Sequence, residues 1–241
     1  MRERERELRL LEELKHSEIA NAITKGLNTG VPYKPTGLSW LPFIPEHWEL
    51  KRLGTAFTEN KTKNSDFLYK NAMKFYYGTL EDKKESFDTD EIEDTYAKYT
   101  VLQKGDIVIN GLNLNYDFVS QRVAISPKDG IITSAYIAIR PRKIETAKFF
   151  CYLFKCMDSM KLFHGMGTGI RLTLSFQELK KQLIPIPPPD EMQKIVEYVD
   201  TKLNIINELI EDLQLQLQQI NEYKQRLIAD VVTGKINVQN N

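Results

Sequence analysis

Two short motifs contain residue types that occur at enzyme sites. The first, Phe163-His164-Gly165-Met166-Gly167, has the F-x-G-x-G spacing with which many adenine methyltransferases bind S-adenosylmethionine. A glycine-rich cofactor loop normally follows a strand, whereas this motif follows a predicted helix. The chain also lacks an Asn-Pro-Pro-Tyr or Asp-Pro-Pro-Tyr sequence that would hold a flipped adenine. Gly165, Gly167 and Gly169 therefore indicate a flexible loop better than they indicate a cofactor site.

The second motif combines carboxylates with a lysine. Asp66 with Glu81-Asp82-Lys83 mimics the D…E-x-K arrangement of nucleases, in which two carboxylates bind Mg²⁺ and the lysine aids the attacking water. Such spacings arise often in a chain with 27% charged residues, so they are weak support for a nuclease. The acidic run from Glu81 to Asp94, which includes Asp88 and Asp90, is more typical of a solvated face than of a metal site.

The other residues with catalytic or ligating side chains are scattered. His16, His47 and His164 lie far apart and form no Ser-His-Asp or histidine metal pattern. Cys151 and Cys156 are too few for a disulfide framework and have no second pair to complete a zinc site. We therefore expect no catalytic residue, no metal and no cofactor on this chain, and a reducing, cytoplasmic environment.

Length and composition set the limits for the fold. A chain of 241 residues with 41% hydrophobic residues can bury a core of useful size. Lys plus Arg and Asp plus Glu are equal at 33 each, so a nucleic-acid-binding face has to be a local basic patch. The start of the chain, MRERERELRL, is charged, and no run approaches the roughly 18 apolar residues of a membrane span. We expect a soluble protein without membrane contact.

The C-terminal part of the chain has a heptad pattern that predicts one long helix. Asp190, after three prolines, is a suitable N-cap, and Gly234 is a suitable stop. The predicted helix over 190–234 would be roughly 65 Å long at about 1.5 Å per residue, followed by a tail over 235–241. Its apolar residues recur at d and a positions and form a narrow stripe that requires another helix. The d series is Val199, Ile206, Leu213, Ile220 and Leu227, and the a series is Val196, Leu203, Ile210, Leu217, Lys224 and Val231.

The end of this helix is echoed near the start of the chain. Residues 228–237 read IADVVTGKIN and residues 19–28 read IANAITKGLN, an offset of 209 residues. Upstream, Leu11 corresponds to Ile220 and Lys15 to Lys224. A chance match is the simpler alternative, but a repeat that is cut within its unit explains the echo better. We therefore interpret residues 1–30 as the tail of a similar helix.

The middle of the chain has a different composition. Residues 31–48 contain four prolines and both tryptophans, which predicts an ordered linker held by aromatic packing. Short β-type runs separated by Gly, Asn, Asp and Pro turns follow, and residues 148–163 read as an apolar-faced helix. Residues 49–189 are therefore predicted to form one mixed domain with a β-rich core, in an α+β chain that continues into the long helix.

Three stretches carry a resemblance to a known family. IPEHWELKRLG opens the domain, GMGTGIRLTLSFQELKKQLIPIPPPDEMQKIV closes it, and YKQRLIADVVTGKI ends the long helix. Together they resemble one half of a type I restriction-modification DNA specificity subunit, over nearly the whole chain. In that family two target recognition domains, each reading half of a split DNA site, are held apart by two long helices. The resemblance implies a half subunit with one target recognition domain, residues 49–189, and one spacer helix.

The resemblance also implies partners. We expect double-stranded DNA, a separate methyltransferase subunit that would carry S-adenosylmethionine, and in a full system a restriction and translocase subunit. A half subunit could complete itself by pairing with a second copy through antiparallel helices. The residues expected to carry this pairing are Val199, Leu203, Ile206, Ile210, Leu213, Leu217, Ile220 and Leu227, with Leu209 beside them.

A domain that reads base pairs needs amide, hydroxyl and Arg donors for base edges and Lys or Arg for phosphates. Candidates lie in three parts of the sequence: the segment 61–78, the Asn-rich run 110–118 together with position 122, and the glycine-rich loop. They are Lys61, Lys63, Lys70, Lys74, Tyr76, Tyr77, Asn110, Asn113, Asn115, Arg122, Thr168 and Arg171. The rival interpretation is an assembly or antirestriction-like decoy protein, whose globular domain binds protein instead of DNA.

Overall fold

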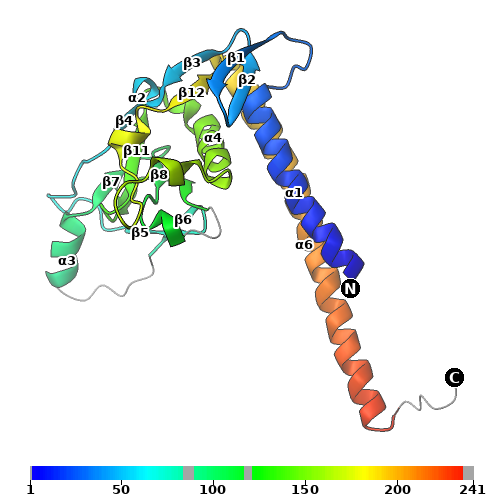
Figure 1. Cartoon of the computed structure of the whole chain (residues 1–241). Coiled ribbons are helices and arrows are strands. Elements are labelled where there is room, and N and C mark those ends of the chain that lie inside the picture. Colours follow the sequence, from blue (N-terminus) through cyan, green and yellow to red (C-terminus); the bar gives the residue numbers. More distant parts are fainter. Residues whose placement is uncertain (1, 84–89, 117–120, 236–241) are drawn as a thin grey trace. The chain divides into compact units, whose positions relative to one another are not determined.

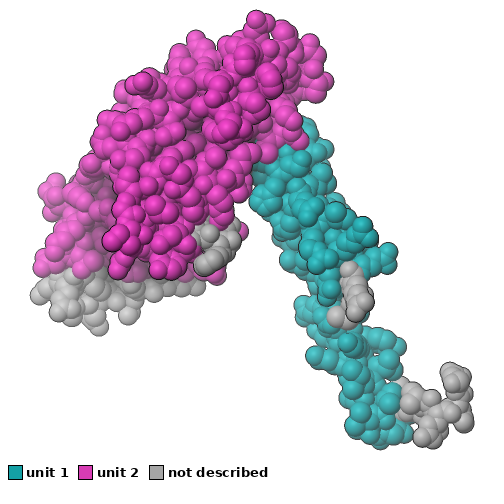
Figure 2. Space-filling view, in the orientation of Figure 1, with its two compact units in different colours: residues 1–19, 197–241 teal, residues 20–196 magenta. Residues whose placement is uncertain are grey.

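The computed structural model describes residues 2–83, 90–116 and 121–235. The chain divides into two units, residues 20–196 and residues 1–19 with 197–241, coloured separately in Figure 2. The predicted α+β class is confirmed, with a β-rich region and the long helix α6 (Pro189–Val232). None of the helices in the described part of the chain has the length and hydropathy of a membrane span.

A four-stranded antiparallel sheet forms the centre of the unit 20–196 (Figure 1). Its strand order is β4 (Phe57–Glu59), β11 (Ile137–Pro141), β8 (Ile107–Ile109) and β9 (Val123–Ile125). All three residues of β8 are buried, because β8 lies between two strands and carries only β-branched side chains. The isoleucine and valine runs of the sequence thus become the central strands.

Within the described residues, four two-stranded antiparallel pairs accompany this sheet. One pair joins β3 (Glu49–Arg52) to β12 (Leu183–Ile186), so the stretch that opens the domain is hydrogen-bonded to the stretch that closes it. The proline run that follows β12 therefore starts from a fixed position. The other pairs are β1 (Tyr33–Leu38) with β2 (Leu41–Pro45), β5 (Met73–Tyr76) with β6 (Thr79–Asp82), and β7 (Thr100–Leu102) with β10 (Gly130–Ile132).

The helix α4 (Ala147–Ser159) provides the aromatic part of the core. It packs against β9, and its Phe150 meets Phe57 of β4 with ring centroids 5.0 Å apart in an edge-to-face arrangement. The prediction of a helix over 148–163 was too long. The helix ends at Ser159 because Lys161 has a φ of 59°, and a 3-10 turn, η3 (Leu162–Met166), follows.

The remaining short elements connect these strands. They are α2 (Leu53–Ala56), α3 (Asp90–Ala97), α5 (Phe176–Leu179), η1 (Leu114–Tyr116) and η2 (Ile144–Thr146). The segment 31–48, expected as a linker, is ordered but consists mainly of the hairpin β1–β2. Trp48, the last residue of this segment, is fully buried.

A buried carboxylate links four parts of the domain. Asp106 is 1% exposed and accepts hydrogen bonds from Arg140 Nε and Nη2, both at 2.8 Å. It also accepts from Asn60 Nδ2 and from the backbone N–H of Gln103, both at 2.9 Å. The Asn60 amide additionally donates to the Val101 carbonyl. These bonds satisfy the buried charge and connect the segments around β4, β7, β8 and β11.

The unit formed by residues 1–19 and 197–241 contains the first part of α1 (Arg2–Lys25) and most of α6. The two helices are antiparallel (Figure 1): Glu18 accepts a hydrogen bond from the Tyr198 hydroxyl at 2.7 Å, and Lys15 donates to Asn207 Oδ1 at 2.9 Å. Toward the start of α1, Arg4 lies beside a shallow hollow that α6 also lines. The part of α6 from Glu197 to about Tyr223 is therefore covered by α1.

Candidate nucleic-acid interface

The hairpin β5–β6 presents one lysine and two tyrosines. Its turn is made by Tyr77, with a φ of 41°, and Gly78, with a φ of 75°. Tyr76 and Tyr77 are 49% and 63% exposed and lie edge to face, with ring centroids 4.7 Å apart. Lys74 lies 5.1 Å from the Tyr76 ring centroid and pairs with Glu81 at 3.2 Å. The hairpin tip is thus an exposed aromatic surface beside a partly neutralised cation.

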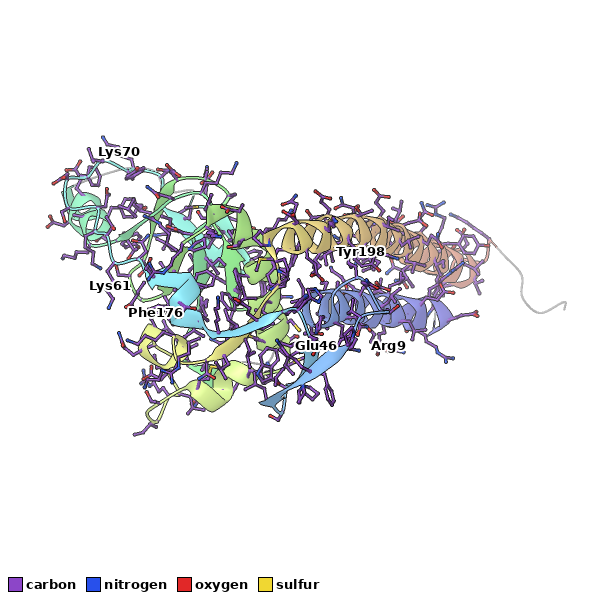
Figure 3. The ribbon with its side chains drawn as sticks, turned by 90° about the horizontal axis from the view of Figure 1, so that it is seen from above. Arg9, Glu46, Lys61, Lys70, Phe176 and Tyr198 are labelled. Atoms are coloured by element: carbon purple, nitrogen blue, oxygen red, sulfur yellow. The ribbon has the colours of Figure 1, made fainter. Side chains whose placement is uncertain are left out.

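The connection between β4 and β5 carries the other three predicted lysines, and Figure 3 labels Lys61 and Lys70 on it. Lys61 is exposed and paired with Glu59 at 2.8 Å. Lys70 lies 5.5 Å from the Phe67 ring centroid. Lys63 instead donates to the Lys98 carbonyl at 3.1 Å and to Ser134 Oγ at 2.6 Å. Lys63 therefore stabilises the neighbouring segments, a role that its position in the sequence did not indicate.

Arg122 organises the Asn-rich loop. Its Nη1 donates to the carbonyls of Asn110 at 3.0 Å and Leu112 at 2.7 Å, and its Nη2 donates to the Asn113 carbonyl at 3.3 Å. The backbone N–H of Arg122 donates to the buried carboxylate of Asp158 at 2.8 Å. The guanidinium thus holds three successive parts of a turn in which Asn113 has a φ of 50°. Its contacts support loop positioning, while Asn113 itself is exposed.

The glycine-rich loop forms a tight hairpin next to the Asn-rich loop. Thr168 and Thr173 exchange two backbone hydrogen bonds, of 3.1 and 2.9 Å. The tip contains Gly169, with a φ of 76°, then Ile170, which is 99% exposed, and Arg171, which is also exposed. A glycine is required at position 169 because side chains rarely adopt this backbone conformation.

Backbone hydrogen bonds fasten these two loops to each other. The N–H of Leu114 donates to the Leu172 carbonyl at 3.0 Å, and the N–H of Leu174 donates to the Gly111 carbonyl at 2.9 Å. A side chain at position 111 would clash with the Leu174 carbonyl, since an added Cβ would lie 2.8 Å from its oxygen. We call residues 110–116 and 165–173 the two-loop surface. Asn113, Thr168 and Arg171 lie on it, and Asn115 is exposed there as well.

The hairpin β5–β6 lies close to the start of β9, which follows Arg122. An added Cβ at Gly78 would lie 3.6 Å from the Val123 carbonyl oxygen and 3.7 Å from Gln121 Cβ. The hairpin turn and the two-loop surface thus approach the same short segment, residues 121–123. Gly78 of the hairpin and the carbonyls of the Asn-rich loop thus meet at this segment, and backbone hydrogen bonds join the glycine-rich loop to the Asn-rich loop.

Two exposed residues of this region were not among the predicted contacts. Ile170 is 99% exposed at the hairpin tip, and Tyr116 is 69% exposed at the end of η1. An isoleucine within an apolar-polar run gives no sign that it will occupy a loop tip, whereas the Gly-x-Gly spacing around it does indicate a turn. Their exposure makes both residues available for apolar or stacking contacts with a bound partner.

The enzyme-like motifs take other roles. Glu81 pairs with Lys74, and Asp82 pairs with Lys128 at 2.7 Å. Phe163 is fully buried in a 3-10 turn that follows a helix, which agrees with a structural role for the F-x-G-x-G sequence. Over residues 2–83, 90–116 and 121–235, no three His, Cys, Asp or Glu side chains gather as metal ligands would. Part of the acidic run, including Asp88, lies outside the described residues.

The two cysteines are core residues. Cys151 and Cys156 on α4 are 3% and 5% exposed. Burial raises the pKa of each thiol from its usual value to about 11, and for Cys151 two lysines oppose part of this effect. Both side chains remain protonated near neutral pH, so neither is a reactive thiolate.

The heptad stripe on α6 differs between its two halves. Its first half packs against α1: Val199, Ile206, Ile210 and Leu213 are buried at 1%, 4%, 6% and 9% exposure. Leu203 and Leu217 are half-buried. In the second half, Ile220 is 38% and Leu227 is 40% exposed. The pairing of these residues with a second copy stays a prediction.

Comparison with known proteins gives the family. A family model described as "Type I restriction modification DNA specificity domain" matches residues 45–219, which is well over half of the chain. The chain belongs to this family, as the resemblance of its motifs predicted.

Two curated relatives come from Methanocaldococcus jannaschii. The type I restriction enzyme MjaVIII specificity subunit is 24% identical over 196 residues, which are 79% of this chain and 43% of the relative. The putative type I restriction enzyme MjaX specificity subunit is 26% identical over 117 residues, 48% of this chain and 27% of the relative. The chain thus matches less than half the length of these curated relatives.

Two solved structures have a similar fold. A chain from a structure on complex assembly and conformational transition of the type I R-M system matches with a TM-score of 0.61 and 15% identity, over 95% of this chain and 53% of that chain. The HsdS subunit from Thermoanaerobacter tengcongensis matches with a TM-score of 0.52 and 15% identity, over 98% of this chain and 54% of that subunit. This chain therefore spans about half the length of the solved chains that it matches.

Proposed function

We propose that this chain is a sequence-specific DNA-binding subunit of a type I restriction-modification system, and that its domain reads one half of a bipartite site. The observation that carries the proposal is the family match over residues 45–219, which includes both the β-rich domain and the first part of α6. The domain exposes the hydroxyl, amide and guanidinium groups that base edges require, on Tyr77, Asn113 and Arg171.

The proposed interface is the two-loop surface together with the tip of the hairpin β5–β6. Loops held by backbone hydrogen bonds are suited to base readout, because little conformational entropy is lost when they bind. Arg171 is exposed, and no carboxylate within the described residues pairs with it. Lys74 and Lys61 pair with single glutamates and could exchange these carboxylates for phosphates. Arg122 would act on DNA indirectly, by holding the loop.

In this proposal the chain performs no chemistry. A separate methyltransferase subunit would bind S-adenosylmethionine and carry the catalytic residues, and a translocating nuclease subunit would join in a full system. Two copies would pair antiparallel through α6 and present two identical domains. Since a twofold axis relates identical readers, the DNA site would be a split palindrome.

The proposal is tested by selecting DNA from a random duplex library with the purified chain, alone and with its cognate methyltransferase subunit, at two salt concentrations. We expect enrichment of one short motif, repeated as an inverted pair at fixed spacing. Matched variants in which Arg171 or Lys51 is replaced by alanine separate the interface from general charge, because Lys51 is an exposed lysine of β3 outside the proposed interface. Enrichment of no motif by either preparation would contradict the proposal and favour a protein-binding role.

A further inference from the structure

The face of α1 that lies on α6 has a regular pattern. Among its half-buried residues, Leu8, Leu11, Lys15 and Glu18 recur at spacings of three and four, with Glu7, Glu12 and Ile19 at the edges of the same face. Two of them make the hydrogen bonds to Asn207 and Tyr198 described above. Leu10 and Leu14, on another face, are 52% and 46% exposed. The contact face of α1 is therefore defined by these four positions.

The internal echo maps this face onto the end of the stripe, residues 217–227, of which α1 covers only the first part. With the offset of 209 residues, Leu8 corresponds to Leu217 and Leu11 to Ile220. Lys15 corresponds to Lys224, and Glu18 corresponds to Leu227. The four positions through which α1 contacts α6 are thus the a and d positions at the end of α6 itself. The end of α6 carries the same contact pattern as α1.

The end of α6 is better suited to the covered face than α1 is. No side chain from residue 3 to residue 19 of α1 is fully buried, whereas Ile206, Ile210 and Leu213 of α6 are buried. Where α1 has the charged Glu18, the end of α6 has Leu227. A leucine at this position would bury more apolar surface than a glutamate, and this burial favours the contact. The end of α6 would therefore make a more apolar contact with this face than α1 does.

Lys224 indicates where the end of α6 would lie. In a pairing of two such ends with each other, Lys224 would lie near its own copy, and two like charges at an a position repel. On the covered face, Lys224 would occupy the place of Lys15 and could donate to Asn207 in the same way. The polar a position then becomes a hydrogen-bonding residue that fixes the register.

We infer that α1 and the end of α6 from a second copy compete for one face of α6. The inference rests on the pairing of two copies in the proposed function. It adds the register of the two α6 helices and names α1 as the helix that competes with the second copy. Leu227 would lie beside Tyr198 of the other copy, and Lys224 beside its Asn207. In an antiparallel pair of identical helices, the twofold axis lies halfway along the chain between two contacting positions. The contacts of 198 with 227 and of 207 with 224 therefore place the axis near Gln214. In the single chain, α1 covers the stripe until a second copy displaces it.

A cross-link tests the competition in the full chain. In the variant Glu18→Cys/Tyr198→Cys, a bis-maleimide joins α1 to α6, and the same protein capped with N-ethylmaleimide is the control. Cys151 and Cys156 are buried and should not react under native conditions, which mass spectrometry of the products verifies. We expect the joined protein to dimerise with a dissociation constant at least about tenfold higher than the capped protein, because α1 can no longer leave.

Equal dimerisation of the joined and capped proteins would overturn the inference, and so would a capped protein that stays monomeric throughout. The DNA selection is repeated on the capped protein, so that the two proposals fail separately. If the cross-link weakens dimerisation but the capped protein enriches no DNA motif, only the DNA-binding role would be contradicted. A motif that is enriched whether or not α1 is joined would contradict the competition alone.

A second measurement tests the register. Gln214→Cys and Asn221→Cys place single thiols at equivalent heptad positions, one heptad apart and both exposed. We expect a short bis-maleimide to join two copies at position 214, whereas position 221 would lie roughly 20 Å from its counterpart along the helices. Preferred joining at position 221 would indicate pairing between the ends of α6 and overturn the inferred register.

Discussion

The guanidinium of Arg140 and the carboxylate of Asp106 are joined by two parallel hydrogen bonds, both of 2.8 Å. Asp106 lies at the base of β8 and is 1% exposed, whereas the Arg140 side chain retains 34% exposure. The hydrogen bonds to Asp106 raise the pKa of Arg140 above its usual value, so the guanidinium stays protonated. This pair connects the two central strands of the domain that carries the proposed DNA interface.

Asp106→Ala should destabilise the domain strongly. Removal of one partner from a buried ion pair leaves the other charge and its donors unsatisfied, which typically costs about 3–5 kcal/mol. Chemical denaturation followed by circular dichroism measures the change in the free energy of unfolding. The matched control is Asp82→Ala, which breaks an exposed pair with Lys128 and should cost less than about 1 kcal/mol. Similar losses in both variants would contradict a structural role for the Asp106 network.

Arg122→Lys should loosen the Asn-rich loop while the charge is retained. A lysine ammonium is a point donor and cannot reproduce the planar fork that reaches the carbonyls of Asn110, Leu112 and Asn113. We expect a loss of about 1–3 kcal/mol in stability. Amide hydrogen exchange at Leu112 and Leu114 should accelerate more than exchange in β8. Uniform acceleration across the domain would argue against a local positioning role.

Arg171→Ala should weaken DNA binding without unfolding the protein, since this side chain is exposed at a loop tip. If Arg171 contacts a base edge, the selected motif should relax at one position, with a loss of about 1–3 kcal/mol. If it contacts a phosphate, the affinity for all DNA sequences should fall, and the slope of log affinity against log salt concentration should decrease by about one. Titrations of the selected site and a scrambled site at several salt concentrations distinguish the two. Unchanged affinity for both would remove Arg171 from the interface.

Stability should fall at alkaline pH because of the buried thiols. The pKa of each cysteine is raised from 9.0 to about 11 in the folded chain, so the unfolded chain loses these protons first. Between about pH 9 and pH 11 the unfolded state binds fewer protons, and the free energy of unfolding decreases as the pH rises, by up to roughly 2–3 kcal/mol per thiol. The full contribution is present below pH 9.

The variant Cys151→Ala provides the comparison, because it removes one titrating thiol from the core. Its free energy of unfolding should be lower at pH 8 but should decrease less steeply between pH 9 and pH 11. The difference between the two slopes isolates this cysteine from the lysines and tyrosines that titrate in the same range. Parallel slopes in the two proteins would contradict the raised pKa.

The sequence predicted the elements whose signals are local. The heptad series and the stop at Gly234 predicted the long helix, since hydrophobic periodicity over many turns has few alternatives. The predicted N-cap was wrong: the helix begins at Pro189, so Asp190 lies in its first turn. The β-branched runs predicted the strands at the centre of the sheet. The hairpin over 33–45 was not predicted because its three prolines make its strands resemble a linker, although edge strands tolerate proline.

Side-chain roles that depend on distant residues could not be predicted. Lys63 looked like a phosphate contact, but Ser134 and the Lys98 carbonyl lie within its reach only after folding. Arg122 looked like a base contact, but it holds carbonyls of a loop that the sequence places ten residues away. The echo between residues 19–28 and 228–237 was visible in the sequence, whereas the fact that α1 lies on α6 was not.

The most direct test of the central claim is a map of methylated adenines in cells that carry the cognate methyltransferase subunit, with and without this chain. The account predicts methylation at one split, palindromic motif only when the chain is present, and weaker or less specific methylation in the Arg171→Ala variant. An active methyltransferase subunit that binds the chain but shows no chain-dependent methylation would contradict it.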